Sequence, residues 1–272
     1  MIFLDGKQPD DNIVYPYMPP KRRHVGYTNP LPAMLNRQTD ITWFPNSWIR
    51  LRTEKKVIYF DPAYLTTYFS DYSDKTEFSR WPDPIDGLPN GLEKADFIFI
   101  THHHKDHCKK VTTDRLRKKQ TRVFGPKTCL TELGDTFQIV KPGDIIGIDN
   151  VTKLEIVDAY NTKNGSSTRK QHKKGKGVGY VLTLGKFRFY HLGDTDFLPE
   201  MKNLQNIDVA FVPMGGKFTM DIQEAVRTTK EINPRIVIPV HKLDKAFEDF
   251  ENGLKGQKIK CIVPKIGQPI TI

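Results

Sequence analysis

Four histidines and one aspartate fall within six positions of the sequence, from His102 to His107. The ordered part of this cluster is His102-x-His104-x-Asp106-His107. Imidazole nitrogens and carboxylate oxygens are ligands of zinc, and also of iron and manganese. Because the cluster follows the apolar run 97–100, a loop leaving a strand could turn these side chains toward one or two ions. For this stretch alone, a histidine-rich surface loop is the alternative.

Two further candidate ligands follow apolar runs much later in the chain. Asp194 stands just beyond the run 187–192, and His241 directly follows the run 236–240. Taken separately, these residues would be read as a turn aspartate and a core histidine. Three apolar runs that each end in a candidate ligand are expected, however, when strand ends converge on one edge of a sheet. The combination therefore favours a shared metal site.

Short apolar or alternating runs predict the β-strands that would position these side chains, with Pro-Gly, Asp-Asn and Gly-Lys turns between several of them. The expected strands are 41–44, 47–53, 55–60, 97–100, 121–125, 137–140, 144–148, 153–160, 178–185, 186–194, 207–216, 235–241 and 258–264. Helices are expected at 111–120, 221–232 and 245–255. Hairpin-connected strands with helices in each half indicate an α+β fold with layered αββα architecture.

The chain divides into an N-terminal arm and one domain. Residues 1–39 are rich in proline and basic residues without a helical or alternating period, which predicts an extended arm. Residues 40–272 form the expected domain. Within it, residues 63–91 combine aromatic residues with many turn formers, and such a segment is either a functional lid or a packed surface excursion.

Composition limits the class of protein. Of the 272 residues, 38% are hydrophobic and 27% charged, as in ordinary globular proteins. No run approaches the roughly 18 apolar residues of a membrane span and no signal peptide is evident, so we expect a cytoplasmic protein. Its three cysteines form no Cys-x-x-Cys pair, which argues against a disulfide framework or cysteine-based zinc site. The net charge of +10 would attract anions, whether a phosphate-bearing substrate, nucleic acid or an acidic surface.

The combined motifs resemble the metallo-β-lactamase-fold hydrolase superfamily. The resemblance covers roughly residues 41–272 and is carried by the 102–107 motif, by Gly193-Asp194-Thr195-Asp196 and by the strand-terminal His241. It implies a four-layer αββα metallo-β-lactamase-like sandwich with the metals at one edge.

Further segments resemble one branch of this superfamily. Residues 211–220 with Glu224-Ala225, followed by Ile238-Pro239-Val240-His241, are similar to the branch that includes L-ascorbate-6-phosphate lactonase and the N-acyl-phosphatidylethanolamine phospholipase D.

The resemblance implies a dinuclear site with two divalent ions, for which zinc is favoured and manganese or iron also fit. Two ions about 3.5 to 4 Å apart can hold a hydroxide as nucleophile and stabilise charge on the substrate oxygen. Asp106 could also orient this hydroxide or pass its proton on, which is a catalytic acid/base role. The implied ligands are His102 and His104 for one ion, Asp106, His107 and His241 for the other, and Asp194 as a bridge.

The sequence departs from the family pattern at two places. Where many relatives have a histidine before the glycine-rich strand, this chain has Asn161, a weaker neutral oxygen ligand. His172 is the candidate replacement, as a ligand or a substrate contact, and a solvated loop histidine is the alternative. The second departure is Pro45-Asn46, where the branch often has glycine and histidine, and we expect it to change the support of the site only.

Three functions follow from these observations. The leading hypothesis is a metal-dependent hydrolase of an ester-like bond: a phosphodiester, a phosphoester or a lactone. Its expected partner is a small anionic or phosphorylated molecule, with a membrane lipid as a further option. A nuclease is the second hypothesis, because six of the fourteen residues in 163–176 are Lys or Arg, although nucleic acid is less favoured. The third is a metal-binding protein with little turnover, in which Asn161 leaves the first metal without a strong ligand at this position.

Overall fold

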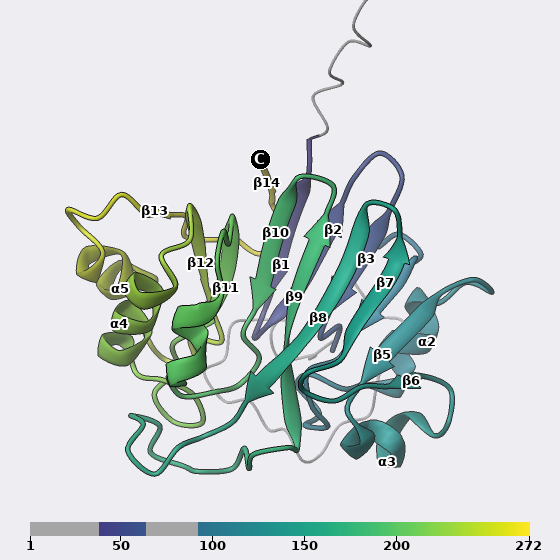
Figure 1. Ribbon diagram of the computed structural model, residues 1–272, viewed down its shortest axis with the longest axis horizontal. Helices are drawn as coiled ribbons and strands as arrows, with labels where there is room; N and C mark the ends of the chain where they lie inside the picture. The colour runs from purple at the N-terminus through teal and green to yellow at the C-terminus, as the bar shows by residue number, and fades with distance from the viewer. Residues whose placement is uncertain (1–37, 64–91) are drawn as a thin grey trace, which may run out of the picture. The chain divides into compact units, whose positions relative to one another are not determined.

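The computed structural model describes residues 38–63 and 92–272. They form two mixed β-sheets packed face to face, with helices on the outer faces (Figure 1). Except for residues 38, 39 and 63, the predicted N-terminal arm and the 63–91 segment lie outside the described residues. No helix within the described ranges is long and apolar enough to cross a membrane.

The first sheet has the strand order β14-β1-β2-β3-β4-β5-β6. The pairs from β14 to β3 are antiparallel, and those from β3 to β6 are parallel. The strands are β1 (Asp40–Phe44), β2 (Trp48–Arg52), β3 (Val57–Phe60), β4 (Phe97–Phe99), β5 (Arg122–Gly125), β6 (Gln138–Ile139) and β14 (Pro269–Thr271).

The second sheet has the order β13-β12-β11-β10-β9-β8-β7 and repeats this division. Its pairs from β7 to β10 are antiparallel, and those from β10 to β13 are parallel. The strands are β7 (Ile145–Asp149), β8 (Thr152–Ala159), β9 (Gly177–Leu184), β10 (Phe187–His191), β11 (Val209–Pro213), β12 (Ile236–Val240) and β13 (Lys260–Cys261).

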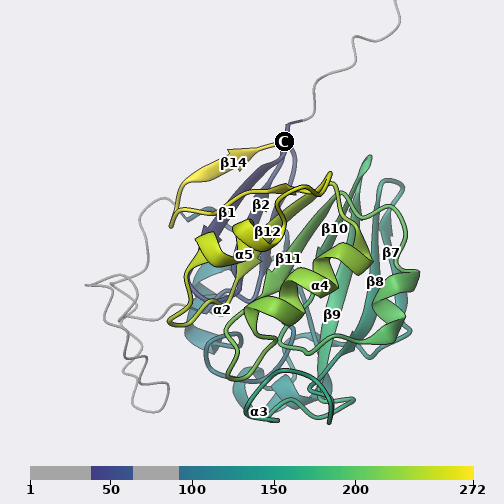
Figure 2. The ribbon, with the colours of Figure 1, turned by 90° about the vertical axis from the view of Figure 1, so that its left-hand side faces the viewer.

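The helices complete four layers and confirm the predicted αββα sandwich. On the outer face of the first sheet, Leu116 of α2 (Lys110–Leu116) and Leu133 of α3 (Leu130–Leu133) join the apolar cluster that contains Trp48. A short 3-10 helix, η2 (Lys127–Cys129), precedes α3. On the outer face of the second sheet lie α4 (Ile222–Ile232) and α5 (Phe247–Gly253), as Figure 2 shows.

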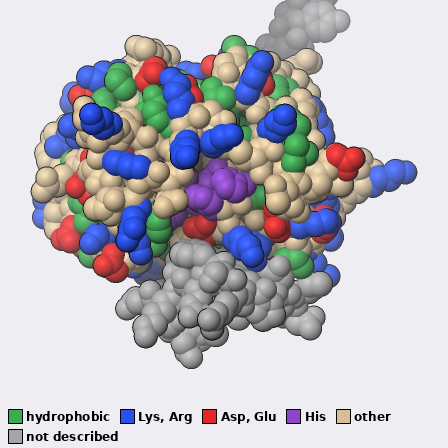
Figure 3. All heavy atoms as spheres, turned by 90° about the horizontal axis from the view of Figure 1, so that it is seen from below, with side chains coloured by type: hydrophobic (Ala, Val, Ile, Leu, Met, Phe, Trp, Pro, Cys, Tyr) green, Lys and Arg blue, Asp and Glu red, His purple; other side chains and the backbone are tan. Residues whose placement is uncertain are grey.

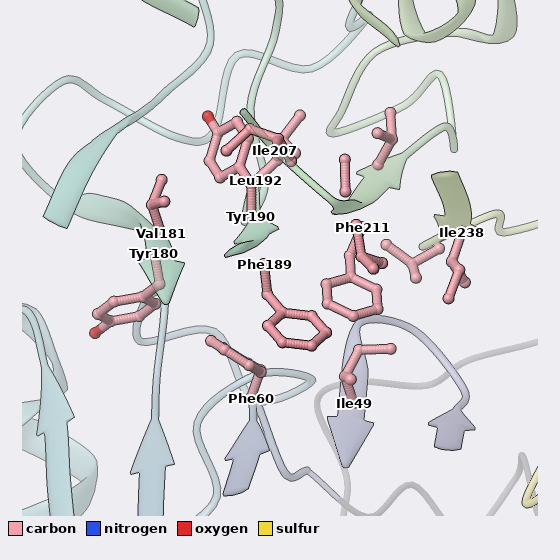
Figure 4. Packing of buried hydrophobic residues seen from close by; sticks show 14 of the residues in the cluster. Ile49, Phe60, Tyr180, Val181, Phe189, Tyr190, Leu192, Ile207, Phe211 and Ile238 are labelled. Carbon is pink, nitrogen blue, oxygen red and sulfur yellow. The ribbon is translucent and has the colours of Figure 1, made fainter. Parts of the chain in front are cut away.

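The main core lies between the sheets. Phe60 of the first sheet faces Phe211 of the second with ring centroids 6.4 Å apart, and it faces Tyr180 at 6.3 Å (Figure 4). The strands β11 and β12 are covered on both faces, which explains why their sequences are continuous apolar runs. This packing fixes the edge of the sandwich at which the loops after β3, β4, β10 and β12 begin.

Several element boundaries differ from the sequence prediction. The expected helix 111–120 ends at Leu116, because Arg117 is extended and its guanidinium donates to the Thr136 carbonyl oxygen. The expected strand 258–264 pairs with β12 only at Lys260 and Cys261. The short elements β14, α3 and η3 (Pro199–Asn203) were not predicted, since three to five residues carry too little periodicity.

Candidate metal centre

Three histidines form one half of the site, here called the all-histidine trio: His102, His104 and His172. The Nε2 atom of His102 lies 3.1 Å from Nδ1 of His104, and Nε2 of His172 lies 3.1 Å from that same Nδ1. Three ring nitrogens from the β4–α2 loop and the β8–β9 loop therefore converge on one point.

The other half, here called the mixed trio, contains Asp106, His107 and His241. Oδ2 of Asp106 lies 3.4 Å from Nε2 of His107 and 3.4 Å from Nε2 of His241. His107 ends the same loop as His102, whereas His241 directly follows β12. Because β10, β11 and β12 are parallel, the residues after β10 and β12 leave the sheet at one edge.

Asp194 lies between the two trios. Its Oδ1 is 3.4 Å from Nε2 of His107, and its Oδ2 is 3.2 Å from Nε2 of His241, 3.4 Å from Nε2 of His172 and 4.0 Å from Nε2 of His102. The preceding Gly193 has φ of 66°, and a Cβ there would come within 2.9 Å of the Val178 carbonyl oxygen. Only glycine can adopt this conformation so close to β9 without strain.

Asp61 fixes the ring orientation of two histidines. Its Oδ2 accepts from Nδ1 of His107 at 2.7 Å and from the Thr101 hydroxyl at 2.7 Å. Since the Thr101 hydrogen is used by Asp61, its oxygen must accept from Nδ1 of His102, 2.9 Å away. The Nδ1 atoms of both histidines thus carry a hydrogen, so their Nε2 atoms are the ones that would bind a metal ion.

His172 is oriented in the same way by neutral oxygens. Its Nδ1 lies 3.1 Å from Oδ1 of Asn161 and 3.1 Å from the Phe218 carbonyl oxygen, and both atoms can only accept. The Nε2 atom of His172 therefore faces His104 as an acceptor. Asn161 also accepts from the His172 backbone N–H at 2.9 Å, and its amide donates to the Phe218 carbonyl oxygen. Asn161 thus contacts His172, and its predicted contact with metal or substrate stays a prediction.

Asn46, in the β1–β2 turn, supports the mixed trio. Its side-chain amide donates to Oδ2 of Asp106 at 3.0 Å, and its carbonyl oxygen accepts from the His241 backbone N–H at 2.9 Å. Asn46 has φ of 61° and His241 has φ of 48°, so both occupy the left-handed region. The departure at Pro45-Asn46 therefore lies in the support of the site, where we expected it.

The two trios differ in the pKa values of their histidines. In the all-histidine trio, burial lowers the pKa of His102, His172 and His104, to about 4 for His104, with neighbouring imidazoles adding to the effect. In the mixed trio, burial acts in the same direction, but the carboxylates around His107 and His241 outweigh it. They raise the pKa of His107 well above its ordinary value and that of His241 to about 9.

The donor set fits divalent ions. Within the described chain, Nε2 of His107, Oδ1 of Asp194 and Nε2 of His241 are buried without a hydrogen-bond partner. Buried polar atoms of this kind are rare unless another group satisfies them. Nitrogen-rich sets with carboxylates suit zinc, with iron and manganese as alternatives. The arrangement can hold one ion at each trio, with Asp194 within reach of both.

Of the eight predicted side chains, all except Asn161 lie in this centre. They are His102, His104, Asp106, His107, His172, Asp194 and His241. Their ligand roles remain predictions. Asp61 is not among the predicted site residues, because it stands alone after the expected strand 55–60 without a recognisable motif. The available signal was its position, since Asp61, like Asp194 and His241, stands directly after or close to the end of an apolar run.

The sequence and fold match known proteins. Residues 40–241 match the family model described as "Beta-lactamase superfamily domain". A UPF0173 protein of Pyrococcus abyssi is 32% identical over 206 residues, covering 74% of this chain and 82% of the relative. A UPF0173 metal-dependent hydrolase of Polynucleobacter asymbioticus is 26% identical over 276 residues, covering 91% of each. A solved structure from Parabacteroides distasonis superimposes with a TM-score of 0.70 at 28% identity, covering 85% of this chain and 94% of that one.

The chain therefore belongs to the beta-lactamase superfamily, and the metallo-β-lactamase fold is confirmed. Within the superfamily it belongs to the UPF0173 family of metal-dependent hydrolases. The narrower resemblance to the lactonase and phospholipase D branch stays a prediction.

Proposed function

We propose that this chain binds two divalent ions, zinc in preference to manganese or iron, and hydrolyses an ester-like bond in a small anionic molecule. The observation that carries the proposal is the convergence of two ligand trios on Asp194, with three imidazoles oriented by partners outside the centre. The all-histidine trio would hold one ion and the mixed trio the other. Bound ions of this kind lower the pKa of water and withdraw charge from the substrate oxygen.

Asp106 is the proposed acid/base residue. Burial would raise the pKa of its carboxyl, but His107 and His241 lower it well below its ordinary value, so the group is ionised at neutral pH. Its Oδ2 is held by the Asn46 amide. An ionised, oriented carboxylate at the centre can accept a proton from the nucleophile and return it to the leaving group.

Lysines near the histidines support an anionic substrate. Histidine atoms lie in the middle of the face seen in Figure 3, with Lys and Arg side chains around them. The exposed Lys173, Lys174 and Lys176 follow His172 in the chain, and Lys105 lies between His104 and Asp106. Among the described residues, no carboxylate lies within 4.0 Å of these four ammonium groups. The Lys174 ammonium group lies 5.2 Å from the centre of the Tyr160 ring, and all four ammonium groups can pair with a phosphate or carboxylate group.

The test is a metal count combined with a substrate panel. The panel contains bis-p-nitrophenyl phosphate, p-nitrophenyl phosphate, a set of lactones and vesicles of a phosphodiester lipid, which separates soluble from membrane-borne substrates. The proposal predicts about two ions per chain, and turnover that is lost on chelation and restored on adding the ion back. Turnover that survives complete removal of metal would refute it.

A nuclease is the second candidate. It is favoured because residues 163–176 contain six Lys or Arg residues and no acidic residue. Cleavage of single-stranded RNA or DNA that weakens steeply with salt would support it, because phosphate contacts release counterions. The third hypothesis, a metal-binding protein with little turnover, rested on Asn161 as a poor ligand. Nε2 of His172, 3.1 Å from Nδ1 of His104, supports the hydrolase over this hypothesis, because it can supply the nitrogen ligand that Asn161 cannot.

A further inference from the structure

The loop that carries His172 contains no helix or strand of its own. Residues 161–176 connect β8 to β9 through turns, and most of their side chains are exposed. At the base of the loop the Asn161 backbone N–H donates to the His172 carbonyl oxygen at 2.7 Å. The ten residues between them need another anchor, because a free loop would give His172 many orientations.

The Thr168 and Arg169 backbone N–H groups donate to the Gly216 and Lys217 carbonyl oxygens, and Asp196 adds a side-chain anchor. Its side chain is fully buried, and it follows Asp194 by two residues. Oδ2 accepts from the Thr162 backbone N–H at 2.8 Å and the Ser167 hydroxyl at 2.9 Å, while Oδ1 accepts from the Ser167 backbone N–H at 3.2 Å. The Lys170 ammonium group adds an ion pair to Oδ2 at 3.1 Å. One carboxylate thus binds the loop at three successive points.

The fit around Asp196 is close. A Cβ at Gly165 would come within 2.2 Å of the Asp196 carboxyl carbon, so only glycine allows the loop to approach this far. Next to it, Glu224 of α4 accepts from the Ser166 backbone N–H at 2.8 Å and from its hydroxyl at 2.6 Å. Both acidic side chains hold the loop to the second sheet and its helix.

We propose that Asp196 is a positioning residue for the metal centre: by binding residues 162–170 it holds Nε2 of His172 toward His104. The inference rests on the proposed function, since it concerns ion binding at the all-histidine trio. The mixed trio receives no residue from this loop, so Asp196 affects one of the two ions. Groups that orient metal ligands typically contribute 10- to 100-fold to metal affinity.

The test is zinc titration of the metal-free full chain and of the variants Asp196→Asn, His172→Ala and the double variant. Asparagine keeps the size of the side chain but replaces one carboxylate oxygen with an NH2 group. This group cannot accept the hydrogen bonds that Oδ2 of Asp196 accepts. We expect Asp196→Asn to weaken one zinc equivalent by roughly 10- to 100-fold and leave the other unchanged. In the double variant Asp196→Asn adds nothing to His172→Ala, because residues that act through one another are not additive.

The matched control is Asp208→Asn, at the start of β11. Asp208 accepts from the Arg188 backbone N–H at 2.8 Å and from the Arg235 guanidinium at 2.9 Å, and it contacts no residue of the loop. It should keep both zinc equivalents at wild-type affinity. If Asp196→Asn does not fold, Ser167→Ala removes one donor and should weaken the same zinc equivalent to a smaller degree.

The outcomes separate the two proposals. A wild-type chain that binds no divalent ion overturns the proposed function, and the inference with it. A wild-type chain with two ions whose Asp196→Asn variant keeps both at full affinity, loses both equally, or adds to His172→Ala overturns the inference alone.

Discussion

In the all-histidine trio three neutral imidazoles meet without a carboxylate of their own, whereas in the mixed trio two imidazoles surround Asp106. Both trios have Asp194 as a neighbour. The pKa values of their histidines are nevertheless shifted in opposite directions: the pKa of His104 falls to about 4, and that of His241 rises to about 9. The difference shows that an ion must displace protons from the mixed trio, while the all-histidine trio is already unprotonated at neutral pH.

The trios also differ in how they are held. His241 directly follows β12, and His107 is fixed by Asp61 directly after β3. His172 instead depends on a loop without regular structure, which Asp196 and Glu224 bind from outside. Both trios take residues from the β4–α2 loop, so they differ in their third histidine: His241 directly follows a strand, whereas His172 lies in a loop that side chains hold in place.

The largest effect is expected where the trios meet. Asp194→Ala removes the oxygens that lie near both, so both ions should bind weakly and hydrolysis should fall by at least about 10³-fold, as for groups that act as a unit. Zinc titration and turnover of the panel substrates measure this. Loss of one ion only would show that Asp194 belongs to a single trio.

Asp61→Asn is expected to have the next largest effect. It removes the charge that orients His107 directly and His102 through Thr101, so the affinity for both ions should fall by roughly 10- to 100-fold. Titration against Asp208→Asn as control checks this. An unchanged affinity would mean that the orientation of these rings does not depend on Asp61.

The pH dependence of binding should differ between the two ions. Each proton that an ion displaces changes its apparent affinity by about tenfold per pH unit. The pKa of His241 is raised to about 9 and that of His107 is raised as well, so the apparent affinity of the mixed trio should rise with pH from pH 7 to at least about 9. The affinity of the all-histidine trio should be nearly constant above about pH 6.5, since the pKa values of its histidines lie below that. Calorimetry in buffers of different ionisation enthalpy counts these protons; equal counts for both ions would contradict the contrast.

The smallest effect concerns the stability of the metal-free protein. The raised pKa values of His107 and His241 contribute stability below about pH 6.5 that is lost as the pH rises toward about 9. The lowered pKa values in the all-histidine trio reduce the free energy of unfolding as the pH falls below about 6.5. In this range the unfolded chain binds protons that the folded chain does not bind. Thermal unfolding should thus show a maximum near pH 6.5. A curve that keeps rising to pH 9 would rule out the protonated mixed trio.

Much of this centre follows from the sequence, because the 102–107 ligands are adjacent in the chain and because parallel strands end at one edge of a sheet. The sequence leaves His172 open among a metal ligand, a substrate contact and a solvated loop histidine, since a loop without periodicity gives no direction to a side chain. Asp61 was missed because its partners, Thr101 and His107, lie at least 40 residues further along the chain. Its role appears only when β3 and β4 are seen to pair in parallel.

The most direct test of the central claim is anomalous X-ray diffraction from a crystal of the zinc-loaded protein. We expect two anomalous peaks, one within bonding distance of the ring nitrogens of the all-histidine trio and one at the mixed trio, with Asp194 between them. A single peak, or peaks away from these side chains, would contradict it.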